Sequence, residues 1–393
     1  HIDEANFGFF TGKKAFNEIL SQRLIEAIRL ESFAAARFLE KVGSIPAWES
    51  QLRISDKAKE IIAYSYVGVI GIQLSKLFAI GKEDLTDGKQ RKYIEKCLQI
   101  AGRSLDLLSF ALISSLWDAI AQQGFTLSVP QQERIAKRLD SNFEPSLPEQ
   151  FDLFRSLTEI FFQSDKNLTI PLPELASFQH KLQSGGSLSN CVDQLNILNE
   201  KLDKAQYNLL DCFEAENQLT AFLEHFPFFA CYRMASIKHI GYSRVRHADP
   251  GYLHRYAALG IDNKANVDAE RINFTPSTAH TDAVLLYRGD AYDEYINLSP
   301  FIIDYNALTS EPGTRVCFFR SRDISDETLE YLFLEDSSIV RVEKKGILKP
   351  DSDYNELMLN AENRKILNLD NVVDQFREAR RCIGGETLNF DDL

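Results

Sequence analysis

The spacing of apolar residues changes near Phe226, and this change restricts the chain to a mixed fold. Before Phe226, apolar side chains recur every three or four residues, which is the pattern of one face of a helix. After it, short runs rich in Tyr, Phe, Val and Ile are separated by turn residues, as in neighbouring strands. We therefore predict an α+β fold: an N-terminal helical bundle, an antiparallel β-meander that forms a small barrel or sandwich, and C-terminal helices.

The same pattern divides the chain of 393 residues into three parts. The predicted parts are a helical bundle over 1–225, an antiparallel β domain over 226–346, and C-terminal helices with a tail over 347–393. Helices are expected at 14–42, 55–81, 89–123, 130–141, 148–163, 190–225, 354–359 and 370–382. Strands are expected at 230–240, 252–259, 283–288, 294–304, 315–320, 329–335 and 338–344.

The last helix of the predicted bundle, 190–225, has a coiled-coil-like spacing of apolar residues that only Glu216 interrupts. Such a seam packs against the protein's own bundle or against a second copy, so the helix is also a candidate surface for oligomerisation.

One apolar segment, 61–80, is long enough to cross a bilayer. It contains Gln73 and Lys76, which membrane spans seldom tolerate, and its Gly68 and Gly71 suit close packing. We expect a buried central helix here and no association with a membrane.

Charge and cysteine content favour a cytoplasmic protein. The formal net charge is -13, which argues against a protein coated with nucleic acid but leaves room for one local basic face. The six cysteines form no C-x-x-C pair, and their scatter is typical of reduced thiols.

The chain lacks several catalytic signatures. It contains no G-x-x-x-x-G-K-[ST], no G-x-G-x-x-G after a strand, no H-E-x-x-H and no G-x-S-x-G. These absences favour a protein that is not an enzyme, and we predict no cofactor.

The stretch "KHIGYSRVRHADPGYLHRY", residues 238–256, is strongly basic within this acidic chain. If 238–246 were one regular strand, one side of it would present Lys238, Tyr242, Arg244 and Arg246. Cations interleaved with tyrosines can hold phosphates and stack on bases. The predicted anion- or partner-binding residues are Arg233, Lys238, Tyr242, Arg244, Arg246 and Arg255.

Two other interpretations of this stretch stay open. Its cations could pair with acids of the same chain, since an acidic protein offers many partners. Its histidines could also bind a metal, although their spacing matches no common pattern. The residues for that weaker alternative are His239, His247, His254 and His280, with Asp249 or Asp282.

The layout "YRMASIKHIGYSRVRH", "YLHRYAAL" and "YINLSPFIIDYN" resembles a β-rich accessory region of large bacterial signalling and conflict proteins. The resemblance covers residues 226–345 and brings no functional residues with it. It implies a non-catalytic regulatory or sensing role, in a setting such as antiviral defence.

From these observations we predict a non-enzymatic interaction or regulatory protein, such as a sensing or adaptor component of a bacterial signalling or defence system. The expected partner is another protein. A nucleic-acid or nucleotide-binding module that uses the basic face at 233–255 is the first alternative. A metal-dependent hydrolase is the second.

Overall fold

The computed structural model describes residues 16–42, 51–83, 86–163, 168–247, 249–261, 270–275, 280–289, 294–325, 327–346 and 361–385. The helices of the N-terminal part are α1 (Glu18–Ala27), α2 (Phe33–Val42), α3 (Gln51–Ser65), α4 (Gly68–Gly81), α5 (Asp87–Gln123), α6 (Val129–Leu139), α7 (Leu147–Gln163), α8 (Ser187–Asp203) and α9 (Leu209–Leu223). The short helix α10 (Tyr305–Leu308) lies among the strands, and α12 (Ala361–Gly384) follows them. The predicted helix 354–359 lies outside the described residues.

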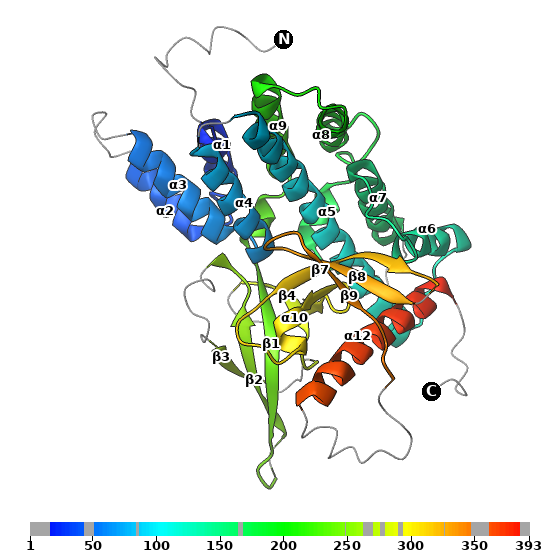
Figure 1. Cartoon of the computed structure of the whole chain (residues 1–393). Coiled ribbons are helices and arrows are strands. Elements are labelled where there is room, and N and C mark those ends of the chain that lie inside the picture. Colours follow the sequence, from blue (N-terminus) through cyan, green and yellow to red (C-terminus); the bar gives the residue numbers. More distant parts are fainter. Residues whose placement is uncertain are drawn as a thin grey trace.

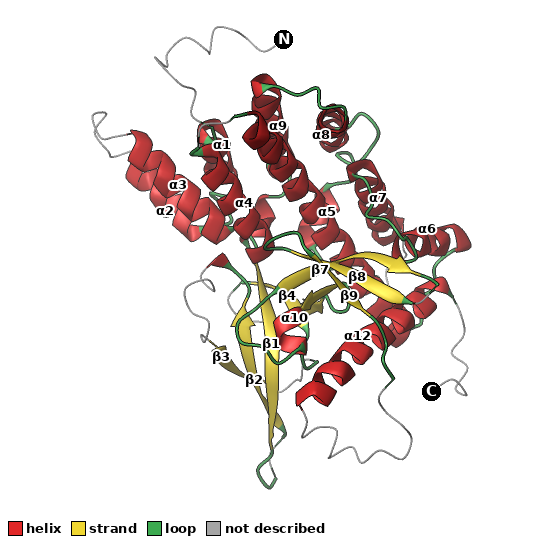
Figure 2. Cartoon of the chain, in the orientation of Figure 1, coloured by secondary structure: helices red, strands yellow, loops and turns green. Residues whose placement is uncertain are grey.

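The predicted α+β fold is confirmed: a bundle of helices lies above two antiparallel sheets, and α12 returns beside the sheets (Figures 1 and 2). Sheet A has the order β3-β2-β1-β4-β5 and sheet B the order β6-β7-β8-β9, so the described strands form two separate sheets and not a closed barrel. The strands are β1 (Tyr232–Ser243), β2 (Gly251–Ala258), β3 (Glu270–Thr275), β4 (Val284–Arg288), β5 (Tyr295–Asn297), β6 (Ile302–Asp304), β7 (Val316–Asp323), β8 (Thr328–Phe333) and β9 (Ile339–Val342).

Helix α5 is the centre of the molecule, because it contacts several other helices: α4, α7, α8, α9 and α12. It is the one described helix that is long and apolar enough to cross a membrane, but 72% of its apolar window is buried inside the protein. The segment 61–80, for which we predicted a buried helix, lies in α3 and in the largely buried helix α4.

Two predicted helices are each interrupted in the structure. The predicted helix 14–42 is α1 followed by α2, with a turn over residues 28–32 between them. The predicted helix 55–81 ends at Ser65 and restarts at Gly68, because the Val67 N–H donates to the Phe229 carbonyl across the fold (2.9 Å). A side chain at Gly68 would place its Cβ 1.6 Å from the Leu259 carbonyl oxygen, so only glycine allows this approach.

The prediction of a single helix over 190–225 is also wrong, because this segment forms two helices, α8 and α9, that pack against each other. Ala205 has a left-handed backbone (φ 52°), and Asn208 then caps α9 by accepting from the Leu210 and Asp211 N–H groups. The apolar seam is buried in the chain's own core, at Leu195, Leu198, Leu202, Cys212, Leu219 and Leu223.

The apolar core continues from the helices into the strands without a break. Phe110 of α5 stacks on Phe301 (ring centroids 5.5 Å apart), and Phe376 of α12 contacts both Phe301 and Phe319 of β7. The change from helix to strand falls near Phe226, between α9 and β1, as predicted. Independent folding of 226–346 stays a prediction, since the core itself crosses that boundary.

Glu216, which interrupts the apolar seam in the sequence, belongs to a buried polar cluster. The Tyr93 hydroxyl lies 2.6 Å from its Oε2 atom and 2.7 Å from Oδ1 of Asn17. The Asn17 backbone N–H donates to the same Glu216 oxygen (3.0 Å). The cluster joins α5 and α9 to the start of α1, and burial raises the pKa of Glu216.

Replacing Tyr93 by Phe should lower the free energy of unfolding by about 1–3 kcal/mol, because a buried carboxyl then loses a hydrogen-bond donor. Urea unfolding followed by circular dichroism measures the change. Tyr64, which is 48% exposed, provides the control: Tyr64→Phe should change stability by less than about 0.5 kcal/mol. Equal effects of the two substitutions would contradict the role given to Tyr93.

Candidate functional site

A β-bulge in β1 separates the predicted basic residues into two groups. Ile237 pairs with Tyr256, but the next pair is His239 with Arg255, so Lys238 is one extra residue in β1. Residues on the two sides of the bulge are therefore out of phase, and the expected common face of 238–246 does not form. β1 also ends at Ser243, which leaves Arg244 and Arg246 in the turn.

Lys238 points into the protein. Its Nζ atom lies 2.5 Å from Oδ2 of Asp304 and donates to the Gly313 carbonyl (2.9 Å). The Lys238 side chain is 13% exposed and the Asp304 side chain is fully buried. The pair joins β1 of sheet A to β6 of sheet B. For Lys238 the structure therefore agrees with the interpretation in which the cations of this stretch pair with acids of the same chain.

Arg233 is also engaged within the fold. Its guanidinium donates to the carbonyls of Ser65 (3.2 Å) and Ala230 (3.0 Å). Ser65 is the last residue of α3, and a cation is favourable at the C-terminus of a helix. Arg233 thus stabilises the end of α3.

The other four predicted residues lie on the outer part of the β1–β2 hairpin. Tyr242, Arg244, Arg246 and Arg255 are exposed. Tyr242 is directly opposite Tyr252, with ring centroids 5.8 Å apart. The turn of this hairpin lies at the far end of the molecule from the bundle (Figure 1).

The histidines of the metal alternative are not gathered at one point. His239 and His247 are exposed, whereas His254 is buried, and burial lowers its pKa. The His280 ring lies 3.2 Å from the amide nitrogen of Asn297. Over the part of the chain that the structure describes, no three His, Cys, Asp or Glu side chains converge as metal ligands.

Of the two carboxylates of the metal alternative, Asp249 is exposed in the hairpin turn, and Asp282 lies near the Lys238–Asp304 pair. Burial raises its pKa to about 7; Lys238 opposes the shift, while Asp304 adds to it. Asp282 is therefore partly protonated near neutral pH.

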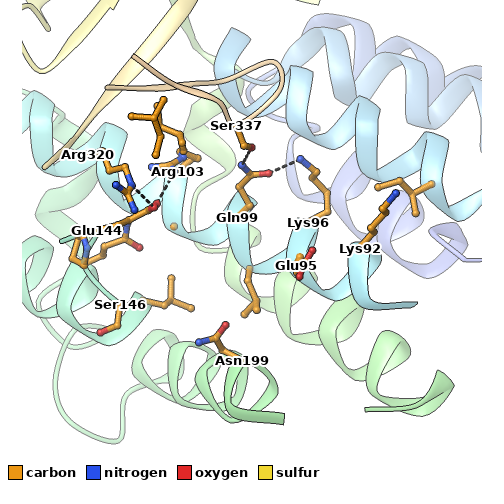
Figure 3. Close-up of a pocket in the computed structure, with 18 residues that line it drawn as sticks. Lys92, Glu95, Lys96, Gln99, Arg103, Glu144, Ser146, Asn199, Arg320 and Ser337 are labelled. Carbon is orange, nitrogen blue, oxygen red and sulfur yellow. Dashed lines mark hydrogen bonds and ion pairs between the residues drawn. The ribbon is translucent and has the colours of Figure 1, made fainter. Parts of the chain in front are cut away.

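A second candidate site is a pocket of about 670 Å³ between α5, α8, the segment that leads into α7, and sheet B (Figure 3). Four cations line it together with two carboxylates, Glu95 and Glu144. The cations are Lys92, Lys96 and Arg103 of α5 and Arg320 of β7.

The two arginines of this pocket are held by carboxylates. Arg103 donates to Asp106 (2.7 Å) and to Glu144 (2.8 Å). Arg320 donates to the other oxygen of Glu144 (3.2 Å) and to Glu330 (2.8 Å).

Lys96 has different partners. Its ammonium donates to the amide oxygens of Gln73 (2.9 Å) and Gln99, and the Gln99 amide in turn donates to the Ser337 hydroxyl (2.9 Å). Burial, with repulsion from Lys76 and Arg103, lowers the pKa of Lys96 to about 8. Sequence inspection missed this pocket, although its signal is present: Lys92, Lys96, Gln99 and Arg103 recur at helical spacing beside the apolar stripe of α5.

Comparison of the chain with family models, with curated proteins and with solved structures finds no match.

Replacing Lys238 by Met should lower the free energy of unfolding by about 3–5 kcal/mol, because Asp304 would stay buried without its cation. Arg244→Ala should change it by less than about 0.5 kcal/mol, since that side chain is exposed. Chemical denaturation of both variants measures the difference. A Lys238→Met protein as stable as the wild type would show that the pair contributes nothing to the fold.

The raised pKa of Asp282 predicts a pH-dependent contribution to stability. Between pH 3.8 and about 7 the folded protein keeps a proton that the unfolded chain has lost, so this group makes stability fall as the pH rises through that window. Asp282→Asn removes the effect, and asparagine tolerates the left-handed backbone at this position (φ 59°). The stability of the variant relative to wild type should therefore increase from pH 5 to pH 8 in urea titrations, and a constant difference would contradict the assignment.

Proposed function

We propose that this chain is a non-enzymatic interaction protein and that the projecting β1–β2 hairpin is its recognition surface. One observation carries the proposal: two arginines and a tyrosine stand exposed at the outer end of the β1–β2 hairpin, the part of sheet A that lies farthest from the helical bundle (Figure 1). Neither Arg244 nor Arg246 has an ion pair with a described carboxylate. Exposed arginine and tyrosine are the side chains that carry much of the binding energy in protein interfaces.

The chemistry of the hairpin end favours a negatively charged partner. The turn of the hairpin carries Arg244 and Arg246 against one exposed carboxylate, Asp249, while the chain as a whole has a net charge of -13. A local cationic end on an acidic protein orients it toward an acidic surface.

Nucleic acid is the candidate partner that the charge and the side chains of the hairpin end support. Strand β3 pairs with β2 as far as Tyr252, so only the turn extends beyond the sheet. Arginines in such a turn can bind phosphates, and the exposed Tyr242 can stack on a base. An acidic protein surface is the competing partner, and it agrees with the role expected from the sequence.

The place of the chain in a bacterial signalling or defence system rests on the resemblance of residues 226–345, and its cytoplasmic location rests on charge and cysteine content.

The test compares the wild-type full chain with an Arg244→Ala/Arg246→Ala variant in fluorescence anisotropy. The probes are a 20-base-pair DNA duplex, a single-stranded RNA and polyglutamate, each at two or more salt concentrations. With DNA, the variant should bind more weakly, and the slope of log affinity against log salt should be smaller by about 0.9 for each arginine that contacts a phosphate.

The control is Arg91→Ala, which removes an exposed cation from helix α5. Arg91 lies outside sheet A, to which the hairpin belongs. Binding of polyglutamate in preference to DNA, lost in the double variant, would assign the hairpin to an acidic protein. Identical binding of all probes by wild type and double variant would remove the hairpin as a recognition surface.

A further inference from the structure

We infer that the pocket beside α5 binds a small molecule that carries two or more phosphate groups, with Lys92 and Lys96 as the cations that hold it. The pocket is built by the helices and sheet B, whereas the hairpin belongs to sheet A. The inference therefore does not depend on the function proposed for the hairpin.

The spacing of the polar residues on α5 suits an elongated anion. Lys92, Lys96, Gln99 and Arg103 follow one another at intervals of four, three and four residues and share one face of the helix. With a rise of about 1.5 Å per residue, this row extends over about 16 Å. A ligand along the row could place separate anionic groups near Lys92 and Lys96.

The two lysines keep positive charge that the described residues do not neutralise. Lys96 is half-buried against two amide oxygens and forms no ion pair with a described carboxylate, and exposed Lys92 forms none either. Glu95, the nearest acid of the pocket in sequence, accepts from Arg91 instead (2.7 Å). A half-buried ammonium without a counter-charge costs free energy, which an anionic ligand would offset.

The lysines favour phosphate over carboxylate. Carboxylates are bound best by the fork of a guanidinium, but both arginines of the pocket are already engaged with Asp106, Glu144 and Glu330. An ammonium binds phosphate as a point charge and needs no fork. A volume of about 670 Å³ is within the usual range for a small-molecule site.

The remaining wall of the pocket can hold the uncharged part of such a ligand. Leu98, Leu147 and Ile339 provide aliphatic surface, and Ser146 and Asn199 provide hydrogen-bonding groups (Figure 3). This combination of an apolar wall and few polar groups is typical of pockets for organic ligands.

The experiment is isothermal titration of the full chain with tripolyphosphate and, separately, with propane-1,2,3-tricarboxylate at the same ionic strength and pH 7. Lys96→Gln and Lys92→Gln should each weaken tripolyphosphate binding about tenfold, as expected for the loss of one charge-assisted contact. Lys89→Gln is the matched control: Lys89 is on the same helix, pairs with Glu83 (2.8 Å) and does not line the pocket. Its binding should equal that of the wild type.

Three results would overturn the inference: no binding of tripolyphosphate by the wild type, unchanged binding by both pocket variants, or equally tight binding of the tricarboxylate. Because Lys92 is exposed, Lys92→Gln tests the site even if Lys96→Gln fails to fold. The Arg244→Ala/Arg246→Ala protein should bind tripolyphosphate in this pocket like the wild type, so failure of the hairpin proposal and failure of this one are distinguishable.

Discussion

A buried charge pair in the middle of α5 organises the side of the bundle that meets sheet B. Arg103 and Asp106 lie about one helical turn apart in α5, and Nη1 of the arginine is 2.7 Å from Oδ2 of the aspartate. Their side chains are only 7% and 5% exposed. Burial of such a pair costs free energy unless every remaining polar atom finds a partner. Gln150 of α7 donates to the second Asp106 oxygen (3.0 Å), and Glu144 accepts from the second arm of Arg103.

This arrangement continues into the sheet, so helix and strand depend on each other. Glu144 also accepts from Arg320 of β7, and Arg138 of α6 donates to the Phe319 and Arg320 carbonyls (both 3.1 Å). The same interface creates the pocket, whose arginines are fixed by these bonds while its lysines are not. Lys238–Asp304 plays the corresponding part between the two sheets and leaves the outer end of the β1–β2 hairpin free of the body.

The sequence predicted the α+β class, the change to strands near Phe226 and the positions of most strands, because these follow from local hydrophobic period. It did not predict the break at Gly68, which depends on the distant Leu259 carbonyl. The bulge at Lys238 depends on pairing between strands, and the pocket on the approach of sheet B to α5. The break before α9 does have a local signal, since Asn208 and Asp211 form a capping box, but the apolar seam continues past it and favours a single helix.

The central structural claim is that the bundle and sheet B form one cooperative unit through the shared apolar core and the charges around Arg103. Native-state hydrogen exchange of the full chain in low denaturant measures this directly, because each amide reports the free energy of its own opening. The slowest amides of β7 and β8 should exchange with the same free energy as those in the middle of α5. Strand amides that open at a clearly lower free energy than α5 would show that the β region unfolds by itself and would contradict the claim.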